Sequence, residues 1–212
     1  MFMGGTFDPV HFGHLRTALE IQQWLGVPKV HLIPSHRSVH RDQPERSAAH
    51  RLQMVELAIA DEPALVSDPR EVQSNQPSYS VYTLEALRKE LGEQVPVCMV
   101  IGMDSFLGLD QWYRYEDLLS LCNLIVVARP GISFAPSPSL QALLQRHQTQ
   151  VEQLLVKPAG ALVVHELTPL SISATQIRGL IAQGKSPRYL LPESVLQYIQ
   201  EQHLYQEQNK GE

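Results

Sequence analysis

Residues 1–14 constrain the fold of this chain more than any other stretch does. Three apolar residues lead into Gly4 and Gly5, and a polar turn that contains Pro9 follows. After this turn, apolar residues recur at the spacing of an α-helix as far as Leu25. The pattern predicts a strand, a tight loop and a helix, in which the two glycines permit positive φ angles and let a ligand approach the backbone.

The junction between this loop and the helix suits a phosphate group, because helix N-termini present backbone N–H groups and the positive end of the helix dipole. His11 and His14 are three residues apart, so in a first helical turn their side chains share one face. Gly13, which lies between them, is expected to keep the space beside that face open. A metal half-site is the other interpretation of such a pair, but no Glu lies between the histidines and no third ligand is evident. We therefore predict no metal site in the protein itself.

Strands alternate with helices along the rest of the chain, which predicts an α/β fold with a parallel sheet and helices on both of its faces. The clearest buried strand, over 95–101, ends at Gly102, where open parallel sheets place their ligands. The other expected strands are 30–34, 64–67, 124–128 and 161–164, and the expected helices include 47–60, 80–91, 175–183 and 193–202. We expect one domain over 1–212, with a surface connector at 131–139 and a frayed tail at 203–212.

Composition excludes several classes of protein. The net charge of −5 argues against general affinity for nucleic acids or membranes. Cys98 and Cys122 have no Cys-x-x-Cys partner, which favours reduced, buried thiols. The chain holds no apolar run of about 18 residues, and its start lacks the pattern of a signal peptide. These features predict a cytoplasmic protein, and they leave its oligomeric state open.

A long loop over 35–46 is rich in basic residues. It contains His40 and Arg41, and Arg51 follows on the next predicted helix. Loops of this length inside a compact domain are usually functional or disordered. Two interpretations stay open, namely a local funnel for an anionic ligand and a solvated, mobile loop.

One motif is rejected on its context. Residues 179–186, Gly-Leu-Ile-Ala-Gln-Gly-Lys-Ser, match the Walker A pattern of phosphate-binding loops. A true Walker A loop follows a strand and opens a helix at its Lys-Ser pair, whereas here the first glycine lies inside a helical pattern. We interpret Gly184 as the cap that ends a helix, with Lys185 facing the negative end of the helix dipole.

Two motifs together resemble a known superfamily. Residues 4–14, Gly-Gly-Thr-Phe-Asp-Pro-Val-His-Phe-Gly-His, resemble the signature of the nucleotidyltransferases that carry a His-x-Gly-His motif. Residues 172–178, Ile-Ser-Ala-Thr-Gln-Ile-Arg, resemble their second signature, Ser-x-Thr-x-Ile-Arg. Pro-Ser-Tyr at 77–79, Ile-Gly-Met-Asp-Ser at 101–105 and Gln-Trp-Tyr at 111–113 resemble one branch, the bacterial nicotinate mononucleotide adenylyltransferases. The resemblance covers nearly the whole chain.

The resemblance implies a Rossmann-like sheet and the transfer of AMP from ATP to nicotinate mononucleotide, with Mg²⁺ carried on the ATP phosphates. Binding of nucleic acid or a membrane is not implied. The implied catalytic residues are His11, His14 and Arg178. The implied ATP-binding residues are Gly4, Gly5, Thr6, Phe7, Gly102, Asp104, Ser173, Thr175 and Ile177. The implied substrate-binding residues are His40, Arg41, Tyr79, Ser80, Trp112, Tyr113 and Arg129.

Two departures from the family and two other functions accompany this prediction. Ser-Val-His-Arg at 38–41 replaces the usual Pro-Pro-His-Lys, and Tyr79-Ser80 replaces Tyr-Thr. Pantetheine-phosphate adenylyltransferase shares both signatures, but that family is shorter and lacks the Trp112-Tyr113 context. A nucleotide-binding regulator without catalysis is the third reading, although binding alone does not require two histidines and an arginine.

Overall fold

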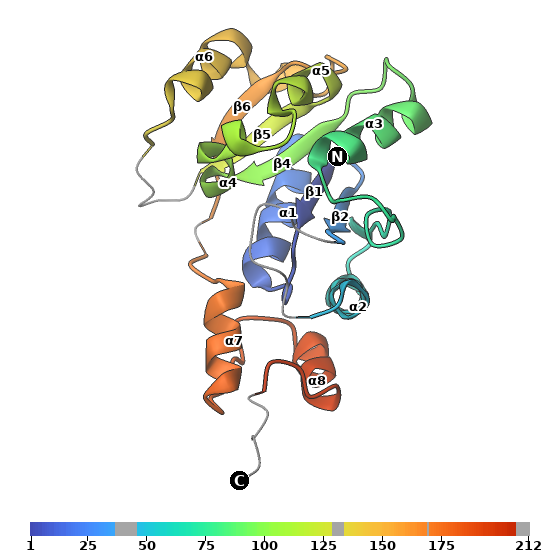
Figure 1. Cartoon of the computed structure of the whole chain (residues 1–212), viewed down its shortest axis with the longest axis vertical. Coiled ribbons are helices and arrows are strands. Elements are labelled where there is room, and N and C mark those ends of the chain that lie inside the picture. Colours follow the sequence, from blue (N-terminus) through green and yellow to red (C-terminus); the bar gives the residue numbers. More distant parts are fainter. Residues whose placement is uncertain (37–45, 129–133, 169, 207–212) are drawn as a thin grey trace.

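A parallel sheet organises the protein (Figure 1). The structure is a computed structural model that describes residues 1–36, 46–128, 134–168 and 170–206. Within these residues the sheet has six strands in the order β3-β2-β1-β4-β5-β6, and every neighbouring pair is parallel. The strands are β1 (Phe2–Gly5), β2 (Val30–Pro34), β3 (Leu65–Ser67), β4 (Cys98–Gly102), β5 (Asn123–Ala128) and β6 (Leu162–Glu166).

Helices connect the strands and cover both faces of the sheet, as the sequence predicts. Figure 1 shows the sheet in the upper half of the view and α7 and α8 in the lower part. The α-helices are α1 (Phe12–Leu25), α2 (Ala48–Ile59), α3 (Ser80–Leu91), α4 (Met103–Leu107), α5 (Leu118–Leu121), α6 (Pro138–His147), α7 (Ala174–Ala182) and α8 (Glu193–Glu201). Across the described ranges, every helix falls short of the length or the hydropathy that a bilayer crossing requires.

Alternation along the strands divides the core into two clusters. In β1, Met3 packs in a first cluster with residues of α1, α2 and α8, and Phe2 packs in a second cluster with residues of α3, α4, α5 and α6. In β4, Val100 and Met99 divide between the two clusters in the same way. Successive side chains of a strand point to opposite faces, so a sheet that is buried on both sides needs apolar residues at almost every position. Both clusters share one sheet, and the chain therefore forms a single domain.

The strand order reverses between β1 and β4, where the chain stops adding strands on one side and continues on the other. Open α/β sheets bind their ligands in the crevice outside the carboxyl ends of the strands at such a point. Gly5 ends β1 and Gly102 ends β4. The fold therefore brings the segments that follow these two glycines to one place.

Several predicted bounds need correction. Strand β1 includes both glycines, and β4 begins at Cys98 instead of residue 95. Pro96 has no N–H group to donate, and the Val95 carbonyl accepts a hydrogen bond from Arg88 Nη1 (2.6 Å), so this segment does not join the sheet. The predicted connector 131–139 is too long, because Pro138 already opens α6. Residues 131–133 lie outside the described ranges.

The prediction of a frayed tail is wrong for residues 203–205. Leu204 and Tyr205 have exposed fractions of only 5% and 4%. The Leu204 amide donates to the Ile199 carbonyl (2.9 Å), which continues the end of α8 into a compact turn. Residues 207–212 of the predicted tail lie outside the described ranges.

The rejection of the Walker A motif is confirmed. Gly179 lies inside α7. Gly184 has a φ angle of 67° and follows the end of that helix, and the Lys185 amide donates to the Leu180 carbonyl (2.8 Å). A glycine in the left-handed region with such a backbone bond ends a helix, so residues 179–186 form a helix cap and no phosphate loop.

Candidate functional site

The backbone at the end of β1 borders open space at Gly4. Gly4 is exposed, and a Cβ atom placed on it would meet no atom within 4 Å. A Cβ atom on Gly5 would lie only 2.9 Å from the ring of Phe7. Gly5 therefore allows the buried Phe7 ring to fold back against the loop.

The positive φ angle of this loop lies at Phe7 and at neither glycine, which corrects the prediction. Phe7 has φ 50° and an exposed fraction of 2%. A left-handed conformation costs a residue with a side chain about 1–2 kcal/mol. Burial of the aromatic ring offsets this cost, so Phe7 fixes the course of the chain between β1 and the histidines.

The two histidines contact each other directly. His11 is the N-cap residue of α1, and its ring stacks on that of His14 with the centroids 3.7 Å apart. The edge of Phe7 contacts His14 with a centroid distance of 5.0 Å. A Cβ atom on Gly13 would lie 3.0 Å from the His11 ring. Gly13 thus makes room for the His11 imidazole, whereas the sequence predicted that it would keep the space beside the histidine face open.

The two signature motifs meet although about 160 residues separate them. Arg178 Nη1 donates to the carbonyl oxygen of Asp8 (2.9 Å). A Cβ atom on Gly13 would lie 3.5 Å from the carbonyl oxygen of Ile172, directly before α7. The beginnings of α1 and α7 therefore lie next to each other. Two helix N-termini with the partly exposed Arg178 and His14 form a surface that suits phosphate groups, and His11 is buried behind it.

The N-terminus of α7 carries the polar residues that the sequence predicts. Ser173 caps the helix by accepting a hydrogen bond from the Gln176 amide (3.2 Å). Ser173 and Thr175 are exposed. Ile177 is fully buried and its amide donates to the Ser173 carbonyl. The Ile177 side chain therefore packs in the core, and only the polar residues of this turn face solvent.

The end of β4 adds a carboxylate. Asp104 is exposed in the first turn of α4, and its Oδ1 atom would lie 2.6 Å from a Cβ atom on Gly102. A side chain at position 102 would displace the Asp104 carboxylate from this position. The carboxylate lies at the carboxyl end of β4, which pairs with β1.

An aromatic cluster lies beyond this strand. The ring of Tyr79 contacts that of Tyr113 at a centroid distance of 4.6 Å, and Tyr82 contacts both rings at 5.6 and 5.8 Å. Trp112 is partly buried against the second core cluster. Ser80 opens α3 directly after Tyr79. Tyr82 is absent from the site residues that the sequence predicts, although its place three residues after Tyr79 puts both rings on one face of the helix.

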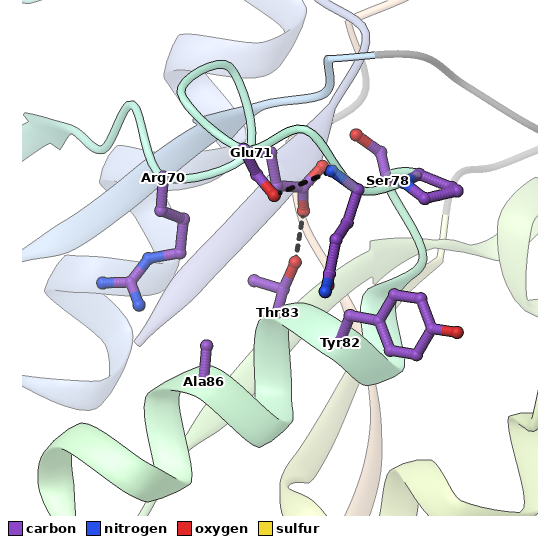
Figure 2. A pocket seen from close by; sticks show the side chains of 9 residues that line it. Arg70, Glu71, Ser78, Tyr82, Thr83 and Ala86 are labelled. Atoms are coloured by element: carbon purple, nitrogen blue, oxygen red, sulfur yellow. Dashed lines mark hydrogen bonds between the residues drawn. The ribbon is translucent and has the colours of Figure 1, made fainter.

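A small pocket of about 90 Å³ adjoins the aromatic cluster (Figure 2). Tyr82 forms part of its wall, and Glu71 accepts a hydrogen bond from Thr83 Oγ1 (2.6 Å) at its inner side. Burial raises the pKa of the Glu71 carboxyl group, although hydrogen bonds from Thr83 and Ser78 oppose the rise. Glu71 thus joins the segment before α3 to the first turns of that helix.

Arg51 does not belong to a basic surface patch, which corrects the prediction. Its side chain is fully buried and donates to the carbonyl oxygens of Thr6 (2.6 Å) and Ser35 (2.6 Å). Burial lowers the pKa of its guanidinium group. Arg51 therefore holds the loops after β1 and β2 together and offers no surface charge. The sequence carried a signal for this, because Arg51 shares a helical face with Val55 and Ile59.

Three predicted substrate-binding residues, His40, Arg41 and Arg129, lie outside the described residues. Both cysteines are buried and form no disulfide, as predicted, and burial raises the pKa of each thiol. Among the described residues, no group of three or more His, Cys, Asp or Glu side chains could hold a metal ion.

The chain is similar to known nucleotidyltransferases over most of its length. Residues 2–180 match the sequence model of the cytidylyltransferase-like family. A probable nicotinate-nucleotide adenylyltransferase of Pseudomonas aeruginosa (strain UCBPP-PA14) is 45% identical over 202 residues, which cover 95% of this chain and 94% of the relative. A relative of the same name from Cellvibrio japonicus (strain Ueda107) is 46% identical over 202 residues, or 95% of this chain and 96% of the relative.

A solved structure shares the fold. The nicotinic acid mononucleotide adenylyltransferase of Plasmodium falciparum, complexed with NaAD, superposes with a TM-score of 0.70 at 17% sequence identity. The superposition covers 96% of this chain and 95% of that one. The Rossmann-like arrangement that the sequence predicts is thereby confirmed.

Proposed function

We infer the reaction from one premise, that the chain belongs to the cytidylyltransferase-like family and, within it, to the nicotinate-nucleotide adenylyltransferases. It is an enzyme that transfers AMP from ATP to nicotinate mononucleotide. The products are nicotinate adenine dinucleotide and pyrophosphate, and the reaction is a step of NAD biosynthesis. The whole chain, 1–212, acts as one nucleotidyltransferase domain, for which we expect a cytoplasmic location.

One observation supports the assignment of residues most directly, namely the hydrogen bond from Arg178 to the Asp8 carbonyl (2.9 Å). It joins the two signature motifs at the point where the strand order reverses. Phosphate groups that bind there contact both helix N-termini at once, and the positive ends of both helices favour their charge.

The chemistry needs alignment and charge stabilisation. A phosphate oxygen of nicotinate mononucleotide attacks the α-phosphorus of ATP, a new P–O bond forms, and the bond to the leaving pyrophosphate breaks. The nucleophile is already an anion, so no general base is required. The protein holds the two phosphates in line and offsets the charge that develops on the bridging and leaving oxygens. His14 and Arg178 supply this stabilisation, and His11 holds the His14 ring in place through the stacked contact.

The remaining predicted residues are assigned by their positions. Thr6, Ser173 and Thr175 offer hydroxyl groups to the phosphates of ATP, and the exposed backbone at Gly4 lets the nucleotide approach. Asp104 faces the ribose of a bound nucleotide. Backbone at Gly5, Phe7, Gly102 and Ile177 shapes the ATP site, because the Phe7 and Ile177 side chains are buried.

The aromatic cluster is assigned to the pyridine ring of nicotinate mononucleotide. Trp112 and Tyr113 provide flat apolar surfaces, and Tyr79 and Ser80 contribute hydroxyl groups at the start of α3. The basic residues His40, Arg41 and Arg129 are assigned to the anionic groups of the substrate.

Magnesium fits this site as a companion of ATP. The described side chains at the site are mainly donors and cations, which bind phosphate oxygens, and they contain no cluster of carboxylates for a metal. Mg²⁺ binds readily through substrate phosphates and keeps several waters, and in that place it neutralises phosphate charge.

Pyrophosphate release from ATP tests the function when nicotinate mononucleotide, nicotinamide mononucleotide or phosphopantetheine is offered in turn. We expect the fastest release with nicotinate mononucleotide. His14→Ala should lower this turnover about a hundredfold or more, as the loss of a group that stabilises developing charge does. A higher rate with phosphopantetheine, or no release with any acceptor, would overturn the proposed function.

A further inference from the structure

The end of the described chain returns to the loop that carries the catalytic histidines. The Tyr205 hydroxyl group donates a hydrogen bond to Oδ1 of Asp8 (2.6 Å), across 197 positions of sequence. Both residues are buried, with exposed fractions of 4% for Tyr205 and 5% for Asp8. A contact of this length to a buried carboxylate belongs to the strong class of hydrogen bonds.

Asp8 is held at two different atoms. Its carboxylate accepts from Tyr205, and its backbone carbonyl accepts from Arg178 Nη1 (2.9 Å). The positive charge of Arg51, which donates to the neighbouring Thr6 carbonyl (2.6 Å), also acts on the Asp8 carboxylate. A buried charge is stable only when it is paired and hydrogen-bonded, so each of these groups restrains the position of Asp8.

The Tyr205 hydroxyl group stays a donor at every working pH. Burial, followed by the charge of Asp8 and the hydrogen bond to it, raises the pKa of Tyr205 far above its ordinary value of 10.0. The Tyr205 ring also lies under the guanidinium group of Arg46, 5.0 Å from its centroid. Tyr205 therefore contacts both the loop after β1 and Arg46, which lies two residues before the start of α2.

We propose that Tyr205 is a positioning residue for the reaction. It fixes Asp8, and through Asp8 it fixes the segment that orients His11 and His14 against Arg178. This role rests on the proposed function, because that function assigns His14 and Arg178 to the charge on the phosphates and His11 to holding the His14 ring. Tyr205 is buried, and the proposed function assigns it to neither substrate. Its loss should therefore change the rate of transfer more than the binding of either substrate.

The test compares Tyr205→Phe with Tyr198→Phe in the full chain. Tyr198 is a matched control, because its hydroxyl group pairs with His50 Nδ1 (2.8 Å) and it lies in α8 near the same terminus. We expect Tyr205→Phe to lower kcat for pyrophosphate release about tenfold or more, since small misplacements of reacting groups have large effects. The KM values for ATP and nicotinate mononucleotide should stay within about threefold, and Tyr198→Phe should keep the wild-type kcat. An unchanged kcat in Tyr205→Phe, or an equal loss in both variants, would overturn the role.

Two further measurements separate this role from general stability and from the proposed function. In a double-mutant cycle, removal of the Tyr205 hydroxyl should cost less in an Asp8→Ala background, which lacks the acceptor, and additive losses would show that Tyr205 does not act through Asp8. Amide hydrogen exchange of residues 8–14 should be faster in Tyr205→Phe than in Tyr198→Phe. The exchange readout needs no activity. If the wild type released no pyrophosphate with nicotinate mononucleotide, the proposed function would fail. Faster exchange in Tyr205→Phe would then still support the restraint of Asp8 by Tyr205. Equal exchange in the two variants would overturn that restraint.

Discussion

The imidazole rings of His11 and His14 stack with their centroids 3.7 Å apart and an interplanar angle of 26°. This contact depends on the residue between them, because a Cβ atom at position 13 would lie 3.0 Å from two atoms of the His11 ring. A distance of this size is tighter than an ordinary van der Waals contact, so a larger residue at position 13 would displace the ring.

Gly13→Ala should therefore lower turnover and leave the fold intact. We expect kcat to fall about tenfold or more, because the shifted His11 ring no longer holds His14 in place. Gly179→Ala is the matched control, since Gly179 also lies in a helix and a Cβ atom on it would meet nothing within 4 Å. Steady-state pyrophosphate release and circular dichroism measure both effects. Wild-type turnover in Gly13→Ala would show that the stacked geometry is not needed.

Lys185→Ala should leave the affinity for ATP within about threefold. Lys185 Nζ donates to the Gln183 side chain (2.9 Å) beyond the end of α7. This helix has nine residues and is about 13.5 Å long at 1.5 Å per residue, and Lys185 lies beyond the end that is opposite Ser173. Isothermal titration with a non-hydrolysable ATP analogue measures the affinity. A loss as large as that of Arg178→Ala would contradict our interpretation of residues 179–186.

The sequence predicts the parallel sheet, the helices on both faces and the place of the site, because these features depend on local patterns. Gly26 and Gly92 end α1 and α3 where the pattern puts them, and Ser47 caps α2 by accepting from the His50 amide (3.3 Å). Such signals act over a few residues and need no knowledge of distant contacts. The two signature motifs add the chemistry, since their residue types are those that bind phosphates.

Two of the missed features depend on distant contacts. No local pattern reveals that Tyr205 bonds to Asp8, and a polar C-terminal segment without apolar periodicity is correctly expected to fray in most proteins. Likewise, the Arg51 charge suggested a surface residue, whereas carbonyl groups of two loops satisfy its guanidinium group inside the protein. Such tertiary contacts override local expectations where the chain must hold an active site.

Glu71→Gln should reduce the pH dependence of stability. Burial raises the pKa of Glu71 in the folded protein above its ordinary value of 4.5. Between the ordinary pKa of 4.5 and the raised pKa of the folded protein, the folded state binds more protons than the unfolded state. The free energy of unfolding therefore falls as the pH rises above 4.5. One proton contributes at most about 1.4 kcal/mol per pH unit in this window. Glutamine keeps an acceptor for the Thr83 hydroxyl group and removes this contribution.

Urea unfolding at a series of pH values measures the free energy of unfolding. The series starts at pH 4.5, the ordinary pKa of a Glu carboxyl group, and goes upward. The wild type should lose more stability than Glu71→Gln over the range. Glu56→Gln serves as the control, because Glu56 is exposed on α2 and should follow the wild type. Parallel curves for the wild type and Glu71→Gln would show that Glu71 does not titrate differently on folding.

The enzyme should prefer a substrate that carries an acid, and not an amide, on the pyridine ring. Nicotinate and nicotinamide differ only in a carboxylate against a carboxamide, and the flat rings of Trp112 and Tyr113 do not distinguish them. Donors around the substituent must do so. Ser80 opens α3, where a hydroxyl group and backbone N–H groups meet the positive end of the helix dipole, and the Tyr79 and Tyr113 rings lie 4.6 Å apart beside it.

A carboxylate accepts from all of these donors, whereas a carboxamide turns its NH₂ group toward at least one of them and leaves that donor unsatisfied. Each such mismatch costs about 1–3 kcal/mol, so two of them give roughly a hundredfold or greater preference for the acid in kcat/KM. Ser80→Ala should lower this ratio about tenfold, mainly by reducing the efficiency with nicotinate mononucleotide, and Ser80→Thr should retain it because the hydroxyl group remains. The measurement compares both mononucleotides side by side at saturating ATP. An unchanged ratio in Ser80→Ala would remove Ser80 from acid recognition, and equal efficiency of the wild type with both substrates would refute the preference itself.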